Sequence, residues 1–143
     1  MQNFWDSLVD DMALCNPPCF VRVVRVLADF REGIEQLCES QEHAHLLVEI
    51  RGILDEDLIK QQLRQGVFAW DSVGLLIGSV VSVIERLQAA GRVEETRTKY
   101  REIQELFSTM DETPTARPRA MVRALEFLND RINVMRIDSA NAR

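Results

Sequence analysis

Cysteine and histidine side chains gather in the first third of this 143-residue chain, at Cys15, Cys19, Cys38, His43 and His45. Structural zinc sites use four thiolate or imidazole ligands, so this group is the candidate for a metal- or small-ligand-binding regulatory site. The Cys15–Cys19 spacing, however, spans two prolines and lacks the two-residue separation of a zinc knuckle. Cys19 and Cys38 also adjoin apolar helix faces, where free cysteine behaves as a small hydrophobic residue. We therefore predict no bound metal or cofactor and keep this regulatory site as the alternative.

Other residue types that perform catalysis are sparse. His43 and His45 lie two residues apart, so on a helix they point in different directions. The acidic run 55–57 could bind a cation, but negative charge also stabilises the start of a helix. We find no glycine-rich phosphate loop, no Gly-x-Ser-x-Gly elbow and no His-Glu-x-x-His pair. The sequence thus predicts a protein that is not an enzyme, with a hydrolase or transferase of dispersed site as a third hypothesis.

The composition is that of a globular protein, with 46% hydrophobic and 28% charged residues. Its length predicts a single helical domain over residues 1–143, either complete or a fragment of a longer helical protein. Three cysteines without a disulfide framework indicate a reducing compartment. The N-terminus does not resemble a signal peptide, and the longest apolar stretch, 73–84, is too short to cross a bilayer. We expect a cytoplasmic protein that is not transmembrane.

The charge is acidic overall but uneven along the chain. A net charge of −6 repels phosphate, so we predict no nucleic-acid partner. Residues 114–143 nevertheless contain six arginines against three acidic residues. This segment is either a docking face for an acidic partner or a solvated helix surface.

Apolar residues recur at three- and four-residue spacing almost throughout, which predicts an all-α fold. We expect an irregular multi-helix bundle or short helical array of about six to seven helices. The expected helices cover residues 3–14, 17–39 (capped by Asn16), 40–54, 55–66, 71–90 (capped by Asp71 or Ser72), 93–110, and 118 onward.

Two of these helices have informative patterns. Residues 73–84 are apolar nearly all round, which predicts a central helix wrapped by its neighbours. Gly74, Gly78 and Ser82 recur every four residues there and predict a smooth edge for close helix packing. The last helix has apolar steps of four, three, four and three, typical of a heptad seam. That seam fits packing within the domain and also fits a homodimer, through Met121, Leu125, Leu128, Ile132 and Met135.

Three segments of the chain are similar to the t-complex protein eleven family, in the family's order and with similar separations. They are PPCF at 17–20, ILDEDLIKQQ at 53–62, and INVMRID at 132–138. The resemblance spans nearly the whole chain and implies an all-helical, non-enzymatic protein-interaction module. It also implies a link to cyclic-AMP and protein-kinase-A signalling and to the sperm flagellum or cilium, since animal members are tied to both.

Two departures from the family pattern are visible. Many members have Pro-Val-Arg-Asp after the central apolar helix, where this chain has AGRVEE at 90–95. Family members are also usually longer. Exposed residues of the segment 53–62, together with Arg92 and the late Arg136, are the predicted protein-binding residues, with helix capping and solvation as the alternative interpretation. They are Asp57, Lys60, Gln61, Gln62, Arg92 and Arg136.

Overall fold

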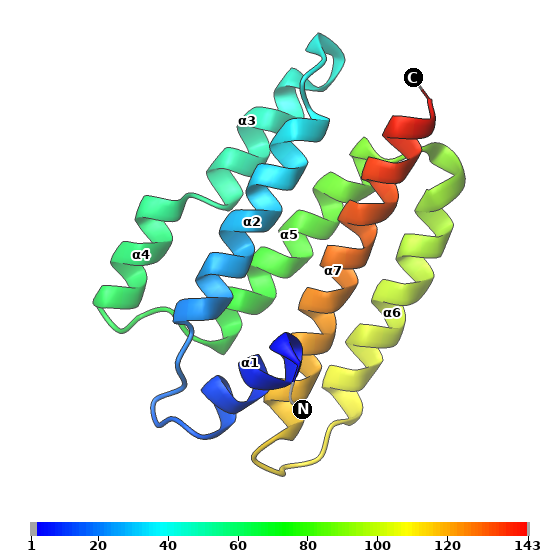
Figure 1. The fold of residues 1–143 in the computed structure, drawn as a ribbon. Coiled ribbons are helices and arrows are strands. Elements are labelled where there is room, and N and C mark those ends of the chain that lie inside the picture. The colour runs from blue at the N-terminus through cyan, green and yellow to red at the C-terminus, as the bar shows by residue number, and fades with distance from the viewer. Residues whose placement is uncertain (1–2, 143) are drawn as a thin grey trace.

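The structure is a computed structural model that describes residues 3–142. Over that range it contains seven α-helices, two short 3₁₀ helices and no strand, which confirms the predicted all-α class (Figure 1). The elements are α1 (Phe4–Ala13), α2 (Val21–Leu37), η1 (Gln41–His43), α3 (Ala44–Ile53), α4 (Glu56–Arg64), α5 (Trp70–Leu87), η2 (Ala90–Arg92), α6 (Val93–Thr109) and α7 (Ala116–Asn141).

The long last helix, α7, is the centre of the fold. It packs against α1, α2, α5 and α6, and it lies between α5 and α6 in Figure 1. The predicted heptad seam is its buried stripe: Leu125 and Leu128 are fully buried, and Met135 is only 5% exposed. Proposing that seam as a dimer contact was therefore wrong, because the chain's own helices cover it.

The apolar helix predicted to be central and wrapped, α5, is covered by its neighbours on only part of its surface. It packs on α3 and α7, and a further face stays open, with Leu75 75% exposed. Its glycines do not form the expected close helix contact. A Cβ atom added at Gly74 would meet nothing within 4 Å, and one at Gly78 would meet only the Tyr100 hydroxyl, at 3.4 Å. Glycine and serine add little apolar surface, so this face can stay uncovered although the sequence looks apolar all round.

The close helix approach occurs elsewhere, where α2 crosses α7 at Gly33. A Cβ atom at Gly33 would lie 3.2 Å from Cγ2 of Ile132 and 2.7 Å from Nη2 of Arg136. Glycine lets the two helices approach at this point, and the Arg136 side chain lies across the gap. No feature of the sequence around Gly33 indicated this contact.

The start of α2 also differs from the prediction. The helix begins at Val21 rather than Pro17, and Asn16 does not cap it. The preceding loop is held by a hydrogen bond from the Cys19 amide to the Asp11 carbonyl (3.2 Å). Phe20 is buried edge-to-face against Phe68 and Trp70. These contacts fix residues 17–20 outside the helix.

Other helix ends follow simple capping chemistry. The Asp55 carboxylate accepts a hydrogen bond from the Leu58 amide (3.1 Å) and caps α4. Gly66 follows the end of α4 with φ of +73°, a conformation that favours glycine. The expected caps of α5, Asp71 or Ser72, were two or three residues late, since the N-cap is Ala69. The Ser72 hydroxyl instead accepts a hydrogen bond from the Ala69 amide. None of the helices between residues 3 and 142 combines the length and apolarity needed to cross a membrane.

Candidate functional site

A groove of about 790 Å³ lies between α5 and α6, with α7 as its floor. Both wall helices pack on α7 and meet each other mainly where the chain turns from one into the other (Figure 1). At that closed end, Thr96 donates a hydrogen bond to Oε1 of Gln88 (2.8 Å), and Arg97 pairs with Glu85 (3.5 Å). Farther along, the Tyr100 hydroxyl reaches to 3.4 Å from the position of a Cβ atom on Gly78. Beyond this point the two helices diverge and the groove opens.

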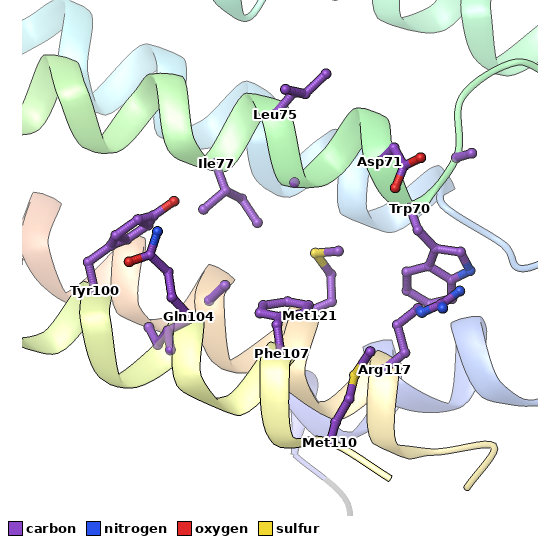
Figure 2. A pocket seen from close by; sticks show the side chains of 14 residues that line it. Trp70, Asp71, Leu75, Ile77, Tyr100, Gln104, Phe107, Met110, Arg117 and Met121 are labelled. Carbon is purple, nitrogen blue, oxygen red and sulfur yellow. The ribbon is translucent and has the colours of Figure 1, made fainter. Parts of the chain in front are cut away.

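Large apolar side chains line the groove, as Figure 2 shows. Ile77, Ile103 and Met121 are buried and form its inner surface. The side chains nearer solvent are only partly buried; they are Trp70, Tyr100, Phe107 and Met110. Aromatic residues and methionine are enriched at protein–protein contacts relative to the rest of a protein surface. The lining therefore resembles a docking surface.

Two charged residues line the groove, Asp71 and Arg117, both near Trp70 (Figure 2). The guanidinium of Arg117 stacks over the Trp70 ring, 5.5 Å from its centroid. The same ring is held from another direction by an edge-to-face contact with Phe20, at a centroid distance of 5.2 Å. The open end of the groove thus has a fixed indole with a cation beside it.

An ion pair between buried Arg131 and partly exposed Glu95 ties the start of α6 to α7. Arg131 is only 1% exposed, and its Nη1 donates to Oε1 of Glu95 at 2.6 Å. Hydrogen bonding to Arg131, together with its charge, holds the pKa of Glu95 below its ordinary value. Arg92 joins the same network, with contacts to Glu95 (3.6 Å) and Asp138 (3.1 Å). This network fixes the α6 wall on the central helix.

The comparisons with known proteins decide the family. The family model described as T-complex protein 11 matches residues 1–143, the whole chain. The chain belongs to the T-complex protein 11 family. This confirms the resemblance drawn from the segments at 17–20, 53–62 and 132–138. No match was found among curated proteins or among solved structures.

The family-derived binding residues occupy two separate places. Asp57, Lys60, Gln61 and Gln62 lie on α4, where Lys60 pairs with Glu56 at 2.8 Å. The other two, Arg92 and Arg136, lie near the C-terminal half of α7, where the first pairs with Asp138 and the second lies against Gly33. Neither set lines the groove. Their role in binding stays a prediction for this member of the T-complex protein 11 family.

The cysteine and histidine cluster is not assembled. Cys15 and Cys19 precede α2, whereas Cys38 follows it, and a helix of 17 residues is about 25 Å long. His43 and His45 follow Cys38 at the same far end. Among residues 3–142, no group of three or more His, Cys, Asp or Glu side chains is placed to hold a metal ion. The alternative of a regulatory site built from these cysteines is therefore wrong, because α2 holds its two halves apart.

The three thiols are expected to react at very different rates in the native protein. Cys15 is exposed and Cys38 is 2% exposed, and burial raises the pKa of the Cys38 thiol. Since the thiolate is the reactive form, Cys15 should react first with a disulfide reagent and Cys38 last. Stopped-flow labelling of the three single Cys→Ser variants measures this order. Fast labelling of Cys38 without denaturant would contradict the packing at the end of α2.

The groove was not found from the sequence, although most of its residues were noticed there. Tyr100, Ile103, Phe107 and Met110 recur at helical spacing along the sequence of α6, and Met121 belongs to the heptad seam. Periodicity identifies an apolar face but does not say whether a neighbouring helix covers it. One signal was present in the sequence. Gly74 and Gly78 give one helix a small-residue edge, which is too small to cover the large side chains of a neighbouring helix.

Proposed function

We propose that this member of the T-complex protein 11 family is a non-enzymatic protein-interaction module and that the groove between α5 and α6 is its binding site. One observation carries the proposal: partly buried Trp70, Tyr100, Phe107 and Met110 line an open groove that no other part of residues 3–142 fills. Covering such side chains is favourable by about 25 cal/mol per Å² of apolar surface. A partner protein that inserts apolar side chains there gains this energy.

Family membership supports a more specific proposal about the partners and the location of the protein. We propose that the partners belong to cyclic-AMP and protein-kinase-A signalling or to the flagellum or cilium, and that the chain acts in the cytoplasm or in those organelles. The α4 residues Asp57, Lys60, Gln61 and Gln62, and Arg92 with Arg136 at a separate place, are proposed as further contacts to such partners. Their positions outside the groove would let one partner be held at two places.

Capture of proteins from cytosolic extract tests this proposal. Immobilised wild-type protein should retain a reproducible set of proteins, identified by mass spectrometry, that includes components of the kinase pathway or the cilium. The Gly74→Leu variant should lose the set, because the new side chain enters the groove where nothing lies within 4 Å of its Cβ position. The triple variant Lys60→Ala, Gln61→Ala, Gln62→Ala should weaken capture without changing helicity. Retention of no protein beyond that of an unrelated helical control would overturn the proposed function.

A further inference from the structure

We infer that the groove's occupant is a short amphipathic helix of another protein, with a carboxylate at the end that meets Arg117. The inference rests on the proposed function and names the chemistry of the partner. Shape is the first argument. The lining runs from Tyr100 in α6 to Met110, which directly follows the helix, a rise of about 15 Å over ten residue steps. That length matches about three turns of a docked helix, enough for apolar side chains at i, i+3, i+4 and i+7.

The two walls differ in a way that suits a helical backbone. On the α5 wall, Gly74 has no neighbour within 4 Å of its Cβ position, so another chain can approach the backbone of α5 closely. On the α6 wall, large side chains reach across the groove towards it (Figure 2). Met110 and Met121 add flexible, polarizable surface that adapts to the side chains of a partner. A partner helix would pack against α5 at Gly74 and contact Tyr100 and Phe107 on the α6 wall.

The charge at the open end selects a carboxylate. Arg117 lies in the first turn of α7, where the helix dipole is positive and disfavours a cation. That turn contains no acidic residue, and no ion pair to Arg117 is formed by residues 3–142. Asp71, on the other wall, lies in the first turn of α5, where the dipole already stabilises its charge. Asp111 and Glu112, in the loop before α7, line a neighbouring pocket together with Arg117, but neither forms an ion pair with it. The Arg117 guanidinium therefore stays open to a partner Asp or Glu.

Arginine and aromatic residues are both enriched at protein–protein contacts, and here they lie together. The Arg117 guanidinium is preorganised on the Trp70 ring, 5.5 Å from its centroid, while its donor groups stay accessible. A carboxylate bound there would make charge-assisted hydrogen bonds in a planar geometry. Its partner helix would place apolar side chains over Trp70 at the same time.

Selection from a yeast-displayed library tests the inference. The library presents 16-residue helical peptides randomised at i, i+3, i+4, i+7 and in both terminal turns. Aromatic or long aliphatic residues should be enriched on one face, with Asp or Glu at one end. A selected peptide, made synthetically, is then titrated against the full chain by fluorescence anisotropy. Peptide binding should also shift the Trp70 indole signal in NMR spectra and leave that of Trp5, on α1, in place.

Three variants make the titration decisive. Gly74→Leu should weaken peptide binding by about tenfold or more, since a blocked apolar contact of 1.4 kcal/mol is a factor of ten. Gly52→Leu on α3 is the matched control, because its Cβ position is equally open and lies outside the groove. Arg117→Glu should weaken binding by a similar factor, and a peptide with Lys in place of its terminal acid should restore it. Circular dichroism melts confirm that each variant is folded.

The outcomes separate this inference from the proposed function. Absence of enriched helices, or enriched helices that bind Gly74→Leu and wild type equally, overturns the helical occupant. Selected helices without an acidic end, insensitive to Arg117→Glu, overturn the carboxylate. A homodimer in native mass spectrometry that Gly74→Leu disrupts assigns the groove to a second copy and also overturns the inference. In each of these cases the proposed function is retained if wild-type protein captures cytosolic proteins and Gly74→Leu abolishes that capture.

Discussion

Replacing Glu95 with glutamine is expected to destabilise the protein several times more than replacing Arg131 with methionine. Arg131 is 1% exposed, and its Nε and Nη2 atoms have no hydrogen-bond partner among residues 3–142. Glutamine would leave this buried cation without its counter-charge, which is strongly destabilising. Methionine removes the buried charge, while the partly exposed Glu95 keeps water and the nearby Lys99 (3.9 Å) as partners. We expect Arg131→Met to change the free energy of unfolding by no more than about 1 kcal/mol.

Urea unfolding of the wild type, the two single variants and the double variant measures this difference. The double variant Glu95→Gln, Arg131→Met should be nearly as stable as Arg131→Met alone, because no charge is then left buried. If the losses in the free energy of unfolding are strictly additive, the two side chains do not stabilise each other. Such a result would also contradict the ion pair as the contact that fixes α6 on α7.

The same pair predicts an acid dependence. Since Arg131 lowers the pKa of Glu95 from its ordinary value of 4.5, the unfolded chain binds more protons than the folded chain between the two pKa values. The pair's contribution to stability is therefore present above pH 4.5 and is lost as the pH falls through the lowered pKa. Thermal melts between pH 7 and pH 3 should fall less steeply for the double variant than for wild type. Arg86 lowers the pKa of Glu49, and Lys60 lowers that of Glu56. These two pairs should account for the acid dependence that remains in the double variant.

The fold class could be predicted from the sequence because each helix has its own apolar period and local start or stop signals. Asp55 and Gly66 delimit α4 through capping chemistry that is local to a few residues. The arrangement of the helices could not be predicted in the same way. The α7 stripe was recognised, but whether α2 and α5 or a second chain covers it depends on contacts between distant residues.

The candidate site shows the same division. The apolar residues of α6 recur on one face, and periodicity alone suggests that the chain itself covers such a face. The groove exists because α5 and α6 meet at Gln88 and Thr96 and then diverge, a feature of geometry with no local signature. The alternative site at the cysteines was wrong because closeness in sequence was taken for closeness in space. The intervening helix α2 places its two halves about 25 Å apart.

Replacing Gly33 with leucine is expected to lower the free energy of unfolding by about 1–2 kcal/mol. Removing glycine from a helix gains up to about 0.8 kcal/mol from helix propensity. The new Cβ atom, however, would lie 3.2 Å from Cγ2 of Ile132, and the rest of the side chain would push α2 away from α7. Overpacking of this kind costs about 1–3 kcal/mol, which exceeds the gain. Chemical unfolding monitored by circular dichroism measures the net change.

Two further variants assign the loss to this helix crossing. Gly52→Leu on α3 has open space around its Cβ position, so it should be neutral or gain a few tenths of a kcal/mol. Adding Arg136→Ala to Gly33→Leu removes the nearest atom, Nη2 at 2.7 Å from the Cβ position, and should recover part of the stability. Ile132 would still oppose the leucine, so recovery should be incomplete. Full recovery would show that the leucine clashes only with the flexible Arg136 side chain. It would contradict the close packing of α2 on α7 at Gly33.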